Sequence, residues 1–181
     1  MSDTRADLVR RYLEDAIAAE KTLAAELRQF AGEGDDEDVQ AAFRAYADEV
    51  QRHSVLLEQR RGELGGSASE GGRAFAHAVS DAAGRPVTAH IQEERTVQNL
   101  LLAFGTASGK TALYEALALV STKAGDEATA ALAHALEEEE QHAAARMSHF
   151  LRSRSKIAFN MLTPNELDPA VETKAFDNPV V

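Results

Sequence analysis

The 181-residue sequence contains no cysteine, and this absence excludes several kinds of site. A chain without thiols has no disulfides, no thiolate zinc sites and no cysteine-ligated iron–sulfur clusters. Proline is scarce, with four residues, and aromatic residues make up only 6% of the chain. Because no run of β-branched or aromatic residues indicates a sheet, the composition favours an all-helical protein.

Basic residues are also in short supply, and the formal net charge is −11. This balance argues against a nucleic-acid-binding surface over most of the protein. The first residues lack the apolar core of a signal peptide, and no apolar run approaches the length of a membrane span. We therefore expect a cytoplasmic protein that binds neither nucleic acid nor a membrane.

What the sequence does contain is long stretches of helical periodicity. Four amphipathic helices are expected at residues 4–30, 36–61, 87–123 and 126–157, with Asp126 as the N-cap of the last. Short links make the first pair and the second pair antiparallel hairpins. Residues 62–87, with a short helical piece at 73–83, predict the long crossover that a bundle needs when its second and third helices run parallel.

The predicted fold class is therefore all-α: an antiparallel four-helix bundle with a long crossover that contains a short helix. The bundle domain is expected to span residues 1–157. Three of the four prolines follow it, at 164, 169 and 179, so residues 158–181 are expected to form an extended C-terminal tail.

Each predicted helix carries one glutamate near the middle of its apolar stripe. In the third helix we place that stripe through Leu101, Glu115 and Leu119. Two histidines share a face with a glutamate, at spacings of four and three residues. The candidate metal ligands are Glu20, Glu49, His53, Glu115, Glu139 and His142.

Carboxylates are very rarely buried without a partner. Any one of these glutamates, taken alone, is explained as a boundary residue that reaches solvent. Four of them facing one interior with two imidazoles predict two divalent metal ions, which would cancel the repulsion between the carboxylates. Oxygen-rich ligation with some imidazole suits iron or manganese, with zinc as a substitute.

Two other patterns carry less weight. Residues 105–111, GTASGKT, resemble a phosphate-binding loop but are one residue short, and no strand precedes them. Gly105 and Gly109 lie four residues apart inside the third helix, where they would permit a close helix approach or mark a kink. Tyr46 and Tyr114 lie near the candidate site, and core packing is the simpler interpretation of both.

Several segments resemble the YciF-type stress-response branch (DUF892-like) of the ferritin-like superfamily. The closest are the A-E-K-x-L element at residues 19–23 and the Tyr114-Glu115 pair, and the resemblance spans the four helices, about two thirds of the chain. It implies a dimetal site, frequent dimeric packing and a link to stress responses. The chain departs from the family at Ala112 and Leu113, where members commonly carry a glutamate and a histidine.

The function that these patterns predict is that of a ferritin-like dimetal carboxylate protein, a homodimer or larger homo-oligomer. It would oxidise ferrous iron or consume peroxide or oxygen in a stress response, and as an enzyme it would be a ferroxidase- or peroxidase-type oxidoreductase. One alternative is a metal-free helical-bundle adaptor, whose glutamates are solvated or paired with arginines such as Arg52 and Arg146. Another is a ferritin-like cargo or subunit that docks through its tail on a larger assembly.

Overall fold

The computed structural model of the protein describes residues 4–65, 89 and 91–162. Four helices make up nearly all of this part: α1 (Thr4–Phe30), α2 (Glu37–Glu63), α4 (Gln92–Ala124) and α5 (Glu127–Leu162). No strand occurs among these residues, so the all-α prediction is confirmed. None of the helices described is both long and apolar enough to cross a membrane.

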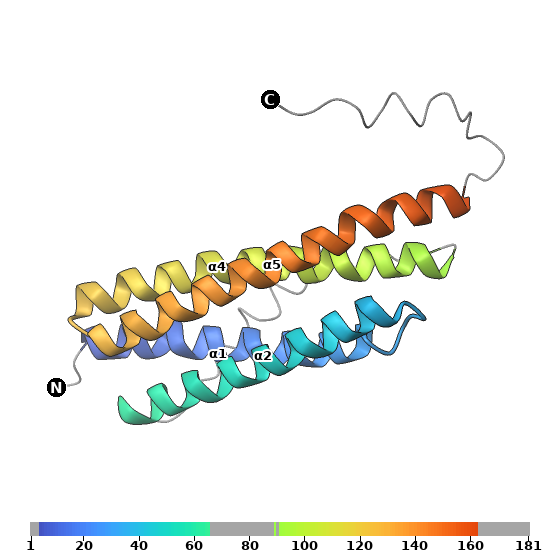
Figure 1. The fold of residues 1–181 in the computed structure, drawn as a ribbon. Helices are drawn as coiled ribbons and strands as arrows, with labels where there is room; N and C mark the ends of the chain where they lie inside the picture. The colour runs from blue at the N-terminus through green and yellow to red at the C-terminus, as the bar shows by residue number, and fades with distance from the viewer. Residues whose placement is uncertain (1–3, 66–88, 90, 163–181) are drawn as a thin grey trace, which may run out of the picture.

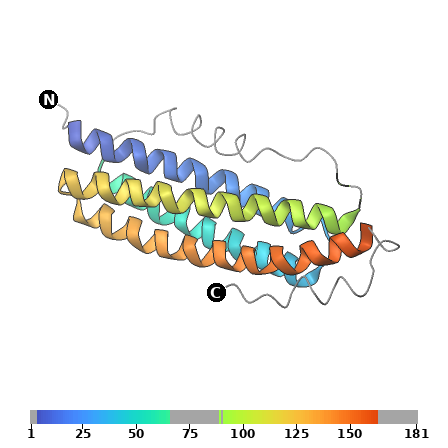
Figure 2. The same cartoon turned by 90° about the horizontal axis from the view of Figure 1, so that it is seen from above.

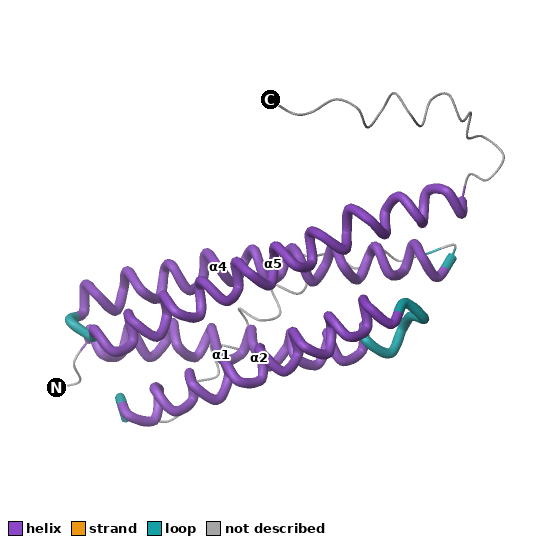
Figure 3. The backbone as a smooth tube through the Cα atoms, in the orientation of Figure 1, coloured by secondary structure: helices purple, strands orange, loops and turns teal. Residues whose placement is uncertain are grey.

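The four helices form an elongated bundle in which α1 and α5 run in one direction and α2 and α4 in the other (Figures 1 and 2). Helix α1 packs on α2 and α4, and α5 packs along α4 and, over a shorter length, on α2. Figure 3 shows the short turns that close each hairpin. Because α2 and α4 are parallel, the predicted need for a crossover is confirmed. The crossover's expected short helix at 73–83 lies outside the described residues.

Local sequence explains where the helices begin and end. The Asp36 carboxylate accepts a hydrogen bond from the Val39 N–H at 3.1 Å and caps α2. Gly125, with φ +81°, ends α4 in the left-handed conformation that glycine adopts without strain. The predicted N-cap of α5 is confirmed, because the Asp126 carboxylate accepts from the Thr129 N–H at 3.0 Å.

Two predicted helix ends differ from the structure by five residues, and the others by no more than two. Helix α4 begins at Gln92 rather than at residue 87. Helix α5 continues to Leu162, so residues 158–162 of the expected extended tail are helical. These five residues, AFNML, include no glycine or proline, and the first helix-breaking residue after them is Pro164. Residues 163–181, the rest of the expected tail, lie outside the described residues.

The bundle interior consists of two apolar clusters separated by a polar layer. The first cluster lies towards the α1–α2 turn and includes Leu23, Phe43 and Met147. The second lies towards the start of α1 and includes Leu13 and Leu136. Along each helix the buried residues change from one cluster to the other at a buried polar position. The ionisable residues at these positions are Glu20, His53, Lys110 and Glu140, and Ser54 is buried beside His53.

The buried face of α4 is shifted by one residue along the sequence from the predicted apolar stripe. Leu101 and Leu119, placed on the stripe, are 52% and 59% exposed. The buried face passes instead through Leu100, Lys110 and Leu117. One residue is a rotation of about 100°. The sequence did not define this face because apolar residues occur almost all around α4.

The two glycines of α4 do not mediate a close helix approach. A Cβ atom added at Gly105 or Gly109 would meet no neighbouring atom within 4 Å. Of the two predicted alternatives, the close helix approach is therefore wrong, because both glycines lie on the exposed side of the helix.

Candidate metal centre

Each helix contributes one charged or titratable side chain to the polar layer. Glu20 comes from α1, His53 from α2, Lys110 from α4 and Glu140 from α5, and none of these side chains is more than 1% exposed. Ionisable groups are almost never buried to this extent unless they are paired. The layer must therefore neutralise its own charge.

Lys110 joins the two buried carboxylates. Its Nζ atom donates to Oε2 of Glu20 and to Oε1 of Glu140, each at 2.6 Å. The same ammonium lies 5.6 Å from the centre of the Tyr46 ring, within the range of a cation–π interaction. These short, charge-assisted contacts place a positive group directly between two negative ones.

Each of the two buried carboxylates also accepts a hydrogen bond from one buried tyrosine. Tyr114 donates its hydroxyl hydrogen to Glu20, and Tyr46 donates to Oε2 of Glu140 at 2.5 Å. Burial and the neighbouring carboxylates raise the pKa of both phenols well above the usual value. The tyrosines therefore stay neutral and act as hydrogen-bond donors.

Glu140 remains ionised because its neighbours outweigh its burial. Burial acts to raise the pKa of the Glu140 carboxyl group. The charge of Lys110 and the hydrogen bonds that the carboxylate accepts outweigh burial and hold this pKa below the usual value. The buried group is therefore a carboxylate at neutral pH, which is the form that a metal ion binds.

His53 lies between the buried layer and the surface. Its Nε2 atom is 2.9 Å from Oε2 of Glu139. Its Nδ1 atom is 3.2 Å from Glu140 Oε1 and 3.6 Å from Glu20 Oε1. Burial favours the neutral imidazole, but the carboxylates of Glu140, Glu20 and Glu139 outweigh it and raise the pKa of His53 to about 9. With Lys110, this imidazolium balances the two buried carboxylates.

The structure brings only part of the predicted ligand set into the layer. Glu20 and His53 are buried there. Glu49 and Glu139 lie at the rim, 32% and 36% exposed, and Glu115 and His142 are on the exposed surface.

The two rim glutamates are both paired with arginines. Glu139 accepts a hydrogen bond from Arg52, and Glu49 accepts one from Arg146. These are the arginines that the metal-free alternative predicted as partners. The rim carboxylates are therefore neutralised without a metal.

Glu140 and Lys110 were missed as site residues. Glu140 ends the acidic run 137–140, and its position four residues after Leu136 and seven before Met147 places it on the buried face. Lys110 follows Ala103 and Ala107 at helical spacing. This helical spacing was overlooked because Lys110 lies in the segment 105–111, which was compared with a phosphate-binding loop.

Glu20, His53 and Glu140 form a group that could hold a metal ion, with one ligand atom of each lying within 4.8 Å of the others. Two carboxylate oxygens and one imidazole nitrogen fit a single transition-metal ion. The His53 Nδ1 atom is buried and has no hydrogen-bond partner of suitable geometry. It can ligate an ion once the imidazolium has lost a proton, as metal binding to histidine requires. The residues described do not bring together the donors for a second ion.

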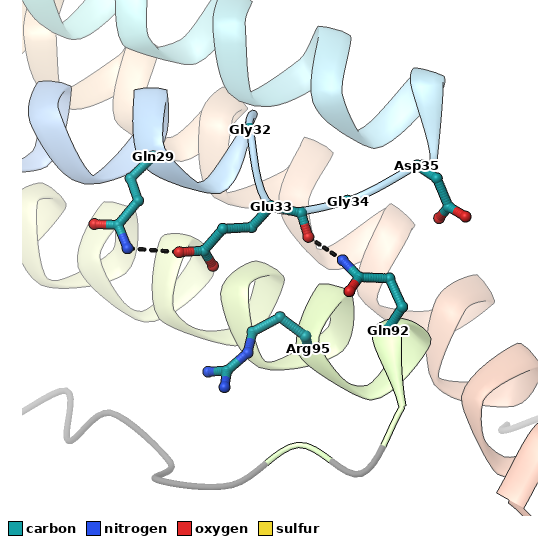
Figure 4. Close-up of a pocket in the computed structure, with 7 residues that line it drawn as sticks. All are labelled: Gln29, Gly32, Glu33, Gly34, Asp35, Gln92 and Arg95. Carbon is teal, nitrogen blue, oxygen red and sulfur yellow. Dashed lines mark hydrogen bonds between the residues drawn. The ribbon is translucent and has the colours of Figure 1, made fainter.

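A separate cavity of about 800 Å³ opens beside the α1–α2 turn (Figure 4). Gln29 donates to the Glu33 carboxylate at 2.5 Å, and Gln92 donates to the Glu33 backbone carbonyl. The Gln92 bond attaches the turn to the start of α4. The cavity lining has no histidine and no convergent carboxylates, so it does not compete with the polar layer as a metal site.

Comparison with known families agrees with this architecture. The family described as "Domain of unknown function (DUF892)" matches residues 4–159. The chain belongs to the DUF892 family. The resemblance inferred from the sequence segments is thereby confirmed, and it covers nearly all of the four-helix bundle.

Solved structures share the DUF892 chain's fold at low sequence identity. The crystal structure of the Escherichia coli stress protein YciF matches with a TM-score of 0.73 and 19% identity, covering 86% of this chain and 99% of YciF. A protein from Xanthomonas campestris pv. campestris matches with a TM-score of 0.69 and 16% identity, covering 91% of this chain and all of the other (100%). Comparison with the curated proteins finds no match.

Proposed function

We propose that this DUF892 protein binds a divalent transition-metal ion in its polar layer. The observation that carries the proposal is the buried convergence of Glu20, His53 and Glu140, with ligand atoms within 4.8 Å of one another. Carboxylate oxygens and imidazole nitrogen suit iron, manganese and zinc. Iron is the first choice, because the fold is that of ferritin-like bundles.

A bound iron or manganese ion would supply electron exchange with oxygen or peroxide. The chain's own residues prepare the site for such chemistry. Tyr46 and Tyr114 fix the orientation of the two carboxylates, and the apolar clusters on either side keep bulk water out. The proposed role is oxidation of ferrous iron, or removal of peroxide or oxygen, in a stress response like that implied by the name of YciF.

The wider six-residue ligand set stays a prediction. A second ion would need the rim carboxylates of Glu49 and Glu139, and these are paired with Arg146 and Arg52. The geometry of the described residues therefore supports one ion per chain. Assembly as a homodimer or larger homo-oligomer is part of the same proposal.

Metal content tests this proposal directly. The full-length protein would be dialysed against Mn²⁺, Zn²⁺ or, without oxygen, Fe²⁺, and bound metal measured by mass spectrometry. We expect about one ion per chain in the wild type and loss of that ion in Glu140→Ala and His53→Ala. Glu115→Ala and His142→Ala are matched controls that should keep it.

Less than roughly half an equivalent of every ion at saturation would reject the proposal. Loss of metal in Glu115→Ala would instead support the set of six metal ligands that the sequence predicted. Oxygen consumption during Fe²⁺ addition, faster in the wild type than in Glu140→Ala, would support the proposed oxidation.

A second candidate is a metal-free interaction protein, and the charge balance of the layer favours it. Lys110 and His53 already neutralise Glu20 and Glu140, so the bundle does not require a metal for its charge. This candidate predicts a cooperative thermal transition that chelator does not shift and no uptake of metal at saturation. Pull-down with and without residues 163–181 would then identify the docking element.

A further inference from the structure

We propose that Lys110 is the protein's own cation: its ammonium group occupies the position between Glu20 and Glu140 that a metal ion would take. The bundle is thereby held together without metal, and an ion must displace the lysine in order to bind. The displacement rests on the proposed function, whereas the counter-ion role does not.

The distances leave room for only one cation. Lys110 Nζ lies 2.6 Å from an oxygen of each carboxylate. A metal ion ligated by the same carboxylates would lie about 2.0–2.2 Å from its oxygen ligands. An ion that binds the same oxygens as the ammonium would overlap with it. An ion on the other oxygens of these carboxylates would be repelled by it, because the repulsion between two cations is strong in a dry interior.

The burial of these groups distinguishes this contact from the arginine–glutamate pairs at the rim of the layer. Lys110, Glu20 and Glu140 are at most 1% exposed. The side chains of the rim pairs, Arg52 with Glu139 and Arg146 with Glu49, are 32% to 50% exposed. Water can solvate a rim charge whose partner is removed, but it cannot reach the buried carboxylates.

The surroundings also favour exchange over a permanent structural role. Tyr46 and Tyr114 hold the carboxylates independently of the lysine, so ligand geometry survives its departure. His53 Nδ1 lies 3.2 Å from Glu140 Oε1, the oxygen that Lys110 also contacts, and this Nδ1 atom has no hydrogen-bond partner of suitable geometry. Lysine carries its charge on a flexible four-carbon stem, which can move without shifting the helix.

The counter-ion role is tested by stability in the presence of chelator. Lys110→Met keeps most of the stem and removes the charge, and Arg146→Met is the matched control at the rim. We expect the folding equilibrium constant to fall by at least about 100-fold in Lys110→Met and by less than about tenfold in Arg146→Met. Glu20→Gln combined with Lys110→Met should recover much of the loss.

Equal losses in the buried and rim variants would overturn the counter-ion role. Lys110→Gln, which keeps a neutral hydrogen-bond donor, replaces Lys110→Met if the latter does not fold without metal. Folding of Lys110→Met only after Mn²⁺ or Zn²⁺ is added would support both parts of the proposal.

The competition is tested by calorimetric titration of Mn²⁺ and Zn²⁺ into the wild type and Lys110→Gln. We expect the variant to bind at least about tenfold more tightly, because no cation has to leave. Binding by the variant alone would support the proposal in its strongest form. Equal or weaker binding by the variant would overturn the competition.

Failure of every variant to bind either ion would reject the proposed function and the competition together. The comparison in chelator would still decide the counter-ion role. The two failures are therefore distinguishable.

Discussion

Adjacent glutamates at 139 and 140 should differ greatly in their contribution to stability. They are consecutive residues of one acidic run, yet Glu140 is fully buried and Glu139 is 36% exposed. Replacing each by glutamine removes one charge at nearly constant volume. The pair of variants therefore tests the orientation of α5 and the burial of the polar layer.

The structure gives the expected magnitudes. Glu140 accepts hydrogen bonds from Lys110 and Tyr46, and removing its charge leaves the buried ammonium with Glu20 alone. Breaking a buried ion pair costs about 3–5 kcal/mol. Glu139 faces Arg52 and the outer edge of His53 at the rim, where solvent reaches the carboxylate and an exposed pair contributes about 0.2–1 kcal/mol.

Urea unfolding followed by circular dichroism, with chelator present, measures both values. With a slope of about 2 kcal/mol per molar urea, the midpoint should fall by roughly 1.5–2.5 M for Glu140→Gln. For Glu139→Gln it should fall by less than about 0.5 M. The chelator removes any contribution from bound metal, which would stabilise the folded state by mass action.

Midpoints that fall equally for the two variants, or further for Glu139→Gln, would show that Glu140 is not the more deeply buried carboxylate of the two. The second result would place Glu139 in the interior, as the sequence prediction had it. An unchanged slope in both variants is the control that the denatured state has not been altered.

Three further perturbations test other parts of the structure. Tyr114→Phe removes a hydroxyl that donates to the buried Glu20 carboxylate and should destabilise the protein by about 1.5–3 kcal/mol in urea unfolding, whereas no change would mean that the bond is not formed. Asp36 accepts hydrogen bonds from Arg154, and these hold the pKa of the Asp36 carboxyl group below its usual value. The ionised carboxylate therefore stabilises the folded state at neutral pH, and this stabilisation is lost as the pH falls through the lowered pKa. The stability difference between the wild type and Asp36→Asn should therefore be constant from about pH 7 to 5 and shrink below about pH 4, and a difference that grows in acid would contradict this. Gly109→Ala, in open space on α4, should stabilise the protein by about 0.5–1 kcal/mol and raise its melting temperature. Gly125→Ala, at φ +81°, should destabilise it by about 1–2 kcal/mol and lower the melting temperature. A higher melting temperature for both variants would count against the left-handed cap at Gly125.

Much of the fold could be predicted because its signals are local. Helical periodicity, the Asp126 cap and the glycine-rich breaks determine four helices within a few residues of their ends. The short hairpin links and the long crossover determine which helices run parallel. Glu20 and His53 were identified because strong apolar residues on α1 and α2 define one face of each helix.

The rest of the site could not be predicted because α4 and α5 do not define one face so clearly. Alanine and leucine occur on several sides of α4, so the sequence favoured Glu115 for the interior, whereas packing places Lys110 there. The run 137–140 offers four glutamates, and only packing selects Glu140. A search for ligands also favours acids and histidines, and so overlooks a lysine that takes the place of an ion.

Anomalous diffraction at the zinc edge, from crystals of the 181-residue protein equilibrated with Zn²⁺, would show whether an ion replaces Lys110 in the polar layer. We predict one peak per chain within about 2.0–2.2 Å of Glu20, His53 and Glu140 ligand atoms, with the Lys110 ammonium moved away from them. A peak at the surface beside Glu115 or His142, or a polar layer that still holds Lys110 between both carboxylates at saturating zinc, would contradict it.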